Sequence, residues 1–251
     1  MCGKDLFTTR WHTAIWFVAT LLLNVIVITP TIAWQNTMDS DEPLIRDSFT
    51  NGKPELQWLP YPHFNQDTLR GTIDNTSPEG EPGIGLLDNK NAGGFAALSY
   101  SATTALSDFY LEAWIYAQIT RGEKGSLNGI AFRIDTVAGN FYRLATHFMG
   151  AEPALSLGYV GKETNHFPQY LARWTGEEIP GGAPPSSGWH KIAIAVQDSK
   201  AEVYWNRAKL LGGPFSIDRV QSGFIGVYAN FVGGLRNAET KVDGLRIWTR
   251  K

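Results

Sequence analysis

The chain has 251 residues, with 22 Lys and Arg against 24 Asp and Glu. A charged fraction of 18% and an aromatic fraction of 12% exclude a disordered or coiled-coil chain, and the length suits one large all-β domain or two smaller domains. The net charge of −2 predicts no nucleic-acid partner. The single cysteine, Cys2, precedes an apolar segment, so the folded domain has no disulfide, thiolate metal site or cysteine nucleophile.

The apolar segment has no charged residue from Trp11 to Met38. Its core approaches 20 residues, whereas a signal peptide has about 7–15. Trp11 and Trp34 are 23 positions apart, which is about 35 Å along a helix and close to the thickness of a bilayer. We predict a retained transmembrane helix, a signal anchor, over residues 11–34, with Trp11, Trp16 and Trp34 at the membrane interfaces. A cleaved signal peptide ending near residues 31–33 is the alternative.

The orientation of this helix follows from the charges beside it. Lys4 and Arg10 precede the segment, while Asp39 and Asp41 follow it. Because positive flanks stay in the cytoplasm, residues 1–10 are predicted to be cytoplasmic. The chain is then a single-pass protein of the cell membrane, with residues 35–43 as a tether and residues 44–251 as a periplasmic or extracellular domain. The lipid bilayer is therefore a predicted partner.

From Leu44 onward, short apolar alternations are separated by Gly, Pro, Asn and Asp, and no stretch keeps a helical period for three turns. About a dozen strands at this spacing predict an all-β, two-sheet antiparallel jelly-roll sandwich. The stretch from His166 to Gly188 is predicted to be a long loop. The predicted strands are residues 44–49, 69–73, 94–100, 108–118, 129–135, 141–148, 154–160, 189–197, 201–205, 223–229 and 241–248.

Several short motifs carry a resemblance to known proteins. They are Asp47-Ser-Phe-Thr-Asn-Gly followed by Trp58, Asp108-Phe-Tyr-Leu-Glu-Ala, Asn128-Gly-Ile-Ala-Phe-Arg, Gly188-Trp-His-Lys-Ile-Ala-Ile, Tyr204-Trp-Asn-Arg, Gly223-Phe-Ile-Gly-Val-Tyr and Val242-Asp-Gly-Leu-Arg-Ile. In this order they resemble the concanavalin A-like lectin/glucanase superfamily, especially laminin-G-like domains and the bacterial keto-disaccharide hydrolase-like family. The likeness covers about residues 44–248. It implies the fold, while lectins, glycosidases, lyases and structural domains all share that fold.

The sequence predicts no catalytic residue. Glucanases of this superfamily carry Glu, Asp and Glu at alternate positions of one strand, and the chain has no such run. His63, His166 and His190 are isolated, which makes a zinc site improbable. Asp47 and Asp243 are weak candidates for structural calcium, because the first and last strands often pair in such sandwiches. Turn or cap roles for these two aspartates are favoured, and no other cofactor is predicted.

One outward face is the best candidate for ligand binding. A hairpin turning at residues 136–140 is predicted to set Arg133 opposite Arg143, with both side chains away from the core. Such a face could bind an acidic or neutral sugar through stacking and bidentate hydrogen bonds. The favoured alternative is that the acidic residue neutralises the arginines while the aromatic residues cover the sheet. The predicted set is Glu112, Trp114, Tyr116, Arg133, Arg143 and His147.

The predicted loop after His166 is the candidate for partner contact. Its aromatic residues and arginine are of the types that dominate interface anchors. The equally weighted alternative is that these aromatic residues fold back onto the sandwich. The set is His166, Phe167, Tyr170, Arg173 and Trp174.

The sequence is compatible with three functions. The favoured one is a membrane-anchored, non-catalytic accessory or interaction subunit of a membrane protein complex, whose partners are the other subunits. The second is a lectin-like carbohydrate-binding module with a glycan partner. The third is a sugar hydrolase of the keto-disaccharide hydrolase-like type, with Glu112, Arg133, Arg143 and His147 as its candidates.

Overall fold

The computed structural model describes residues 42–64, 67–88, 96–118, 125–149, 152–182, 187–232 and 239–249. The domain comprises residues 43–251. The helix predicted at residues 11–34, with Trp11, Trp16 and Trp34, lies outside the described residues. Within the described ranges, no helix has the length and apolar character needed to cross a membrane.

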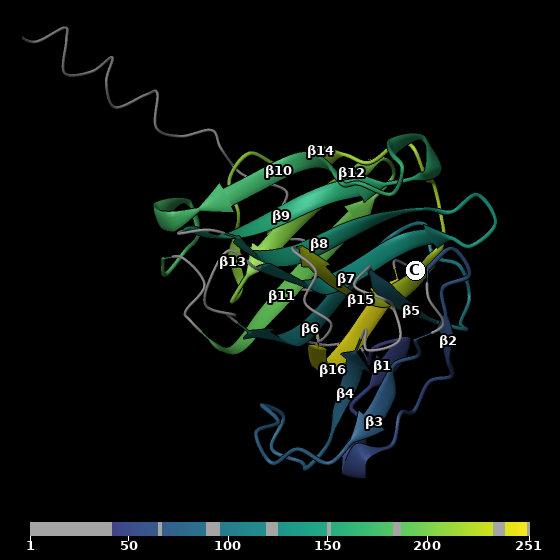
Figure 1. The fold of residues 1–251 in the computed structure, drawn as a ribbon, viewed down its shortest axis with the longest axis vertical. Helices are drawn as coiled ribbons and strands as arrows, with labels where there is room; N and C mark the ends of the chain where they lie inside the picture. The colour runs from purple at the N-terminus through teal and green to yellow at the C-terminus, as the bar shows by residue number, and fades with distance from the viewer. Residues whose placement is uncertain are drawn as a thin grey trace, which may run out of the picture. The chain divides into compact units, whose positions relative to one another are not determined.

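The domain is a sandwich of two antiparallel sheets, as the sequence predicts, and its described strands pair with their neighbours in antiparallel register (Figure 1). Sheet A has the order β13 (Ala208–Lys209), β12 (Lys200–Trp205), β11 (Ser187–Gln197), β6 (Phe109–Gln118), β16 (Glu239–Thr249), β4 (Ile84–Asp88) and β3 (Arg70–Thr72). In the same sheet, β1 (Ile45–Asp47) pairs with β16, and β14 (Phe215–Ser216) pairs with β12. Sheet B has the order β10 (Gln169–Thr175), β9 (Glu152–Val160), β8 (Asn140–Met149), β7 (Gly125–Asp135), β15 (Phe224–Val232), β5 (Ala97–Ser101) and β2 (Trp58–Pro60). Three short 3-10 turns are η1 (Thr50–Gly52), η2 (Lys162–Thr164) and η3 (Gly176–Glu178).

Strict alternation along the strands builds the core between the sheets. On β6, Phe109, Leu111 and Ile115 are buried in the main apolar cluster, while Glu112 and Trp114 lie half-buried on the opposite face. Apolar side chains of β7, β8 and β9 enter the same cluster from sheet B. Burial of apolar surface between the two layers is the main stabilising term for such a sandwich.

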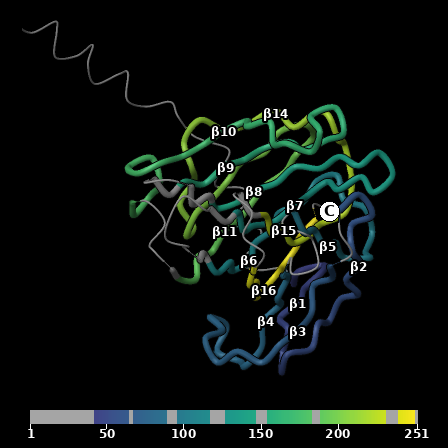
Figure 2. The backbone as a smooth tube through the Cα atoms, in the orientation of Figure 1, coloured from purple at the N-terminus to yellow at the C-terminus, as the bar shows by residue number. Residues whose placement is uncertain are grey.

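The first described strand lies beside the last one. Figure 2 shows β1, in purple, along β16, in yellow, and Asp47 is registered with Leu245. The buried Asp47 carboxylate accepts hydrogen bonds from the backbone N–H groups of Phe49, Glu55 and Leu56. It also accepts one from Trp58 Nε1 at 2.8 Å. These donors fix the turn that leads from sheet A to sheet B.

Two local predictions are wrong. The stretch from His166 to Gly188 is not a single loop, because it contains β10 and η3. The hairpin does turn at residues 136–139, but a β-bulge interrupts β7 between Phe132 and Asp135. Arg143 is therefore opposite Ala131, and Arg133 adopts a positive φ of 47° within the bulge. One extra residue in a strand changes the face of every side chain beyond it.

Candidate functional site

The six residues predicted to share one face are divided between the two sheets. Glu112, Trp114 and Tyr116 lie on β6, on the outer face of sheet A. The Glu112 carboxylate pairs with Lys191 Nζ at 2.7 Å and with Arg246 Nη1 at 3.3 Å. The Glu112 charge is therefore neutralised within its own sheet, and its partners differ from the two arginines, Arg133 and Arg143, that the favoured alternative gave it.

Arg133 is buried and has a structural role. Its guanidinium donates hydrogen bonds to the carbonyl oxygens of Ser107, Asp198, Ile217 and Val220. Burial lowers the pKa of this arginine. The predicted outward orientation is wrong because the bulge turns the side chain toward the segments that flank β6, β12 and β14.

Arg143 is also fully buried, but it lies on the face of sheet B that points away from the main core. Its register partners are Ala131 on β7 and Gly158 on β9, so only small side chains lie next to it along the row. The guanidinium carbon is 5.4 Å from the ring centroid of Tyr228 and 5.8 Å from that of Tyr170. Cation–π contacts of this kind orient a guanidinium without occupying its N–H donors.

The donors of Arg143 are the unusual feature of this face. Its Nε, Nη1 and Nη2 atoms have no hydrogen-bond acceptor in the part of the chain that the structure describes. The neighbouring Tyr228 hydroxyl accepts a hydrogen bond from Asn230 Nδ2 at 2.9 Å. Burial raises the pKa of Tyr228, so this hydroxyl is neutral and does not form an ion pair with the guanidinium.

Tyr170 contacts Arg143 from β10, the edge strand of sheet B. It is registered with Gly158, which is itself registered with Arg143 on the next strand. The Tyr170 side chain remains 46% exposed. Arg173, on the same strand, is registered with Ser156 and is exposed. The structure thus joins one predicted ligand residue, Arg143, to the predicted partner-contact set.

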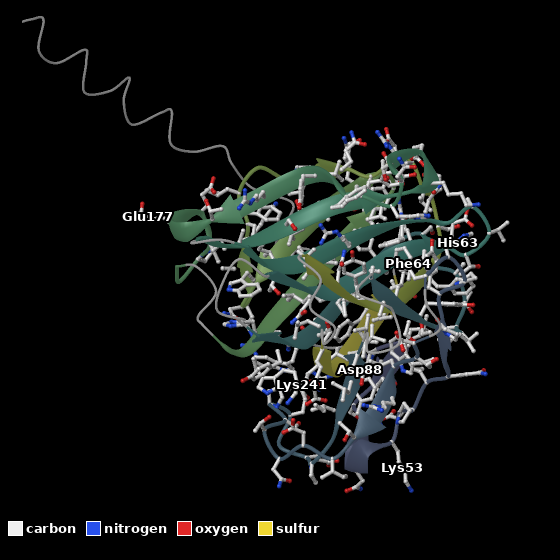
Figure 3. All side chains as sticks on the ribbon, viewed as in Figure 1. Lys53, His63, Phe64, Asp88, Glu177 and Lys241 are labelled. Carbon is white, nitrogen blue, oxygen red and sulfur yellow. The ribbon has the colours of Figure 1, made fainter. Side chains whose placement is uncertain are left out.

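Among the described residues, the other three of the predicted partner-contact set do not contact Arg143 in any interaction that the structure shows. Phe167 is 75% exposed, and the half-buried His166 ring packs 5.6 Å from Phe64 and 6.4 Å from His63. Figure 3 places His63 and Phe64 together at the end of the domain opposite Glu177. Trp174 is buried in the main core, which matches the equally weighted alternative that the aromatic residues of this stretch fold back onto the sandwich. A bulge between Tyr170 and Ala172 turns it toward the main core, where its Nε1 donates to the carbonyl oxygen of Leu211.

The two candidate calcium ligands, Asp47 and Asp243, accept hydrogen bonds that fix neighbouring loops. Asp47 accepts the four hydrogen bonds described above, and Asp243 accepts from Ser77 Oγ at 2.6 Å and from the Gly244 N–H at 2.7 Å. Burial raises the pKa of both carboxyl groups. Among the described residues, no group of three or more His, Cys, Asp or Glu side chains could hold a metal ion. The side chain of His147 lies outside the described part of β8.

Tyr228 and Asn230 were not predicted as site residues. They lie two positions apart on β15, so they share the outer face of sheet B. The alternation of Phe224-Ile-Gly-Val-Tyr-Ala-Asn230 in the sequence was enough to predict that these two residues share a face. What the sequence could not supply was which neighbouring strand faced them.

The described strands form a jelly-roll sandwich of the concanavalin A-like kind, which is the fold that the predicted resemblance implies. No protein-family model matches the sequence, and no curated protein matches it significantly.

Several solved structures have the same fold. The carbohydrate-binding module CBM66 from Bacillus subtilis is 13% identical, with a TM-score of 0.50 over 78% of this chain and 98% of that chain. The cellulose-induced protein Cip1 is 17% identical, with a TM-score of 0.53 over 82% and 97% of the two chains. The β-glucanase of Bacillus licheniformis is 12% identical, with a TM-score of 0.53 over 84% and 100%. At these identities the likeness establishes the fold alone.

Proposed function

We propose that the domain is a carbohydrate-binding module that holds a glycan at the β10 edge of sheet B. The observation that carries this proposal is the half-exposed ring of Tyr170 standing beside the buried guanidinium of Arg143. Sugar-binding surfaces combine an aromatic platform for the apolar face of the ring with a few fixed polar groups for its substituents. Phe167, which is 75% exposed, precedes Tyr170 by three residues in the chain and is the second aromatic side chain that we propose for glycan contact.

The fold neighbours support this choice among the three functions that the sequence left open. They include a carbohydrate-binding module and a β-glucanase. They lend support to the carbohydrate-binding alternative rather than to the accessory subunit of a membrane complex that the sequence favoured. The proposed role is binding without catalysis, because the sequence lacks the Glu, Asp and Glu run at alternate positions of one strand that glucanases of the resembled superfamily carry. The enzyme candidate Glu112 is instead held by Lys191 and Arg246 on sheet A.

We also propose that residues 11–34 hold this module at the outer face of the cell membrane. The support is the uncharged stretch and the flanking charges of the sequence. In this arrangement the tether at residues 35–43 gives the module access to glycans outside the membrane. N-terminal sequencing of the mature protein tests the anchor, and a chain beginning near Trp34 would contradict it.

A glycan array with the full-length protein tests the binding proposal. The protein is kept in a detergent without a sugar headgroup, so that the detergent does not compete for the site. We expect Tyr170→Ala and Phe167→Ala each to weaken binding about tenfold, which corresponds to about 1.4 kcal/mol. Ile73→Ala is the matched control, because Ile73 is an apolar residue that is 60% exposed, next to β3 of sheet A. A correctly folded protein that binds no glycan would overturn the proposal.

A further inference from the structure

Arg133 and Arg143 make an informative pair, because both are fully buried in adjacent strands of sheet B. The Arg133 guanidinium donates to four carbonyl oxygens. Arg143 donates to no acceptor within the described residues, and its contacts there are the rings of Tyr170 and Tyr228. A buried charge with free donors is unfavourable for folding, so its presence points to a role other than stability.

The surroundings of Arg143 show what would satisfy those donors. A guanidinium presents a planar fork that matches the two oxygens of a carboxylate or of a sulfate group. The Tyr228 hydroxyl is kept neutral by burial and does not compensate the charge. Arg173 lies exposed on the same face of β10, registered with Ser156, and adds a second positive charge to this edge of sheet B. The complement of this face is therefore an anion.

We infer that the glycan bound at this face is anionic, and that a carboxylate or sulfate group on its sugar ring is held by Arg143. This inference rests on the proposed carbohydrate-binding function and narrows its ligand class. The Tyr170 ring, on the edge strand and partly exposed, is the covering side chain that can rotate to admit the anion. Rotamer changes of exposed side chains are fast, so admission needs no rearrangement of the strands. The sugar ring then stacks beside the tyrosine while its acidic group reaches the guanidinium.

Binding of matched oligosaccharide pairs to the full-length protein tests this inference. The carboxylate pairs are oligogalacturonates and oligoalginates, each against its carboxyl-reduced neutral form. The sulfate pair is a chondroitin sulfate oligosaccharide against its desulfated form. We expect at least one acidic member to bind ten times or more tightly than its neutral partner. The pair that responds identifies whether the anion is a carboxylate or a sulfate.

Two substitutions connect the preference for anions to Arg143. Arg143→Met should remove the preference and lower the affinity for the acidic member at least tenfold. Arg143→Lys keeps the charge without the fork and should retain an intermediate affinity. Thermal unfolding of each variant near the parent temperature shows that the domain is folded.

The outcomes separate this inference from the proposed function. Equal binding of neutral and acidic members, with Arg143→Met unaffected, overturns the inference and leaves the carbohydrate-binding proposal intact. Binding of no oligosaccharide of either kind by the folded protein overturns both. Loss of the acidic preference in Tyr170→Ala but not in Arg143→Met would also count against the guanidinium as the anion-binding group.

Discussion

Replacement of each buried arginine by methionine, which has a similar length but no charge, should give opposite results for stability. In Arg133→Met, the buried carbonyl oxygens of Ile217 and Val220 lose their donors, and each unsatisfied buried group costs about 1–3 kcal/mol. The carbonyls of Ser107 and Asp198 are part-buried and can be hydrated instead. Asp108 loses an ion pair at 3.9 Å. Relief of the buried charge offsets part of this, and we expect a net loss of about 3–5 kcal/mol.

Arg143→Met deletes no hydrogen bond within the described residues. It removes two cation–π contacts, worth about 0.5–2 kcal/mol each, and it removes the unfavourable burial of an unpaired charge. We therefore expect the free energy of unfolding to stay within about 1 kcal/mol of the parent or to rise.

Urea unfolding of both variants, followed by tryptophan fluorescence, measures the contrast. For a domain of this size, the loss in Arg133→Met corresponds to a melting temperature lower by roughly 10 °C. Equal losses in the two variants, or a loss above about 3 kcal/mol in Arg143→Met, would refute the assignment of Arg133 to structure and Arg143 to binding.

Three further predictions concern other polar groups. Asp47→Ala leaves four donors unsatisfied, and we expect the free energy of unfolding in urea to fall by about 3 kcal/mol. Trp58→Phe removes only one of these donors and should lower it by about 1 kcal/mol. Equal losses in the two variants would contradict the reasoning. The hydrogen bond from Lys241 lowers the pKa of Asp74 to about 2, below its unfolded value, so this pair stabilises the fold above about pH 4 and the contribution is lost as the pH falls toward 2. Asp74→Asn should therefore flatten the acid limb of a stability–pH curve, and an unchanged slope would exclude the pair as a cause. Glu112→Gln should cost less than about 1 kcal/mol and leave glycan affinity within twofold, whereas a large loss of affinity would move the binding face to sheet A.

Strand existence was predictable wherever the period of two was unbroken. The alternation of residues 108–118 predicted β6 to within one residue of its start, and the closing residues 241–248 lie within β16. Such strands are specified locally, because one face must be buried and the other must face outward.

The site was less predictable because it depends on two bulges. Gly129-Ile-Ala-Phe-Arg-Ile-Asp135 alternates like a regular strand, yet the extra residue near Arg133 changes its partner on β8. The bulge between Tyr170 and Ala172 likewise sends Tyr170 to the outer face and Trp174 to the core. Pattern reasoning from the sequence therefore assigned Glu112 and Arg143 to the correct faces, but it could not assign Arg133 and Trp174, which lie in or beyond a bulge. A bulge is selected by contacts between strands distant in the chain, which a local pattern does not contain.

The position of β16 also governs how the chain completes its folding. This last described strand lies between β6 and β4, and it pairs with β1 as well. Among the described strands, β1, β3 and β4 are joined to the rest of sheet A only through β16, so they cannot pair with it until β16 has been synthesised. Contacts that span nearly the whole chain make folding slow and leave edges exposed during synthesis. A truncation before Glu239 would leave β4 and β1 without their neighbour in the sheet, so the domain should assemble only after β16 has been synthesised.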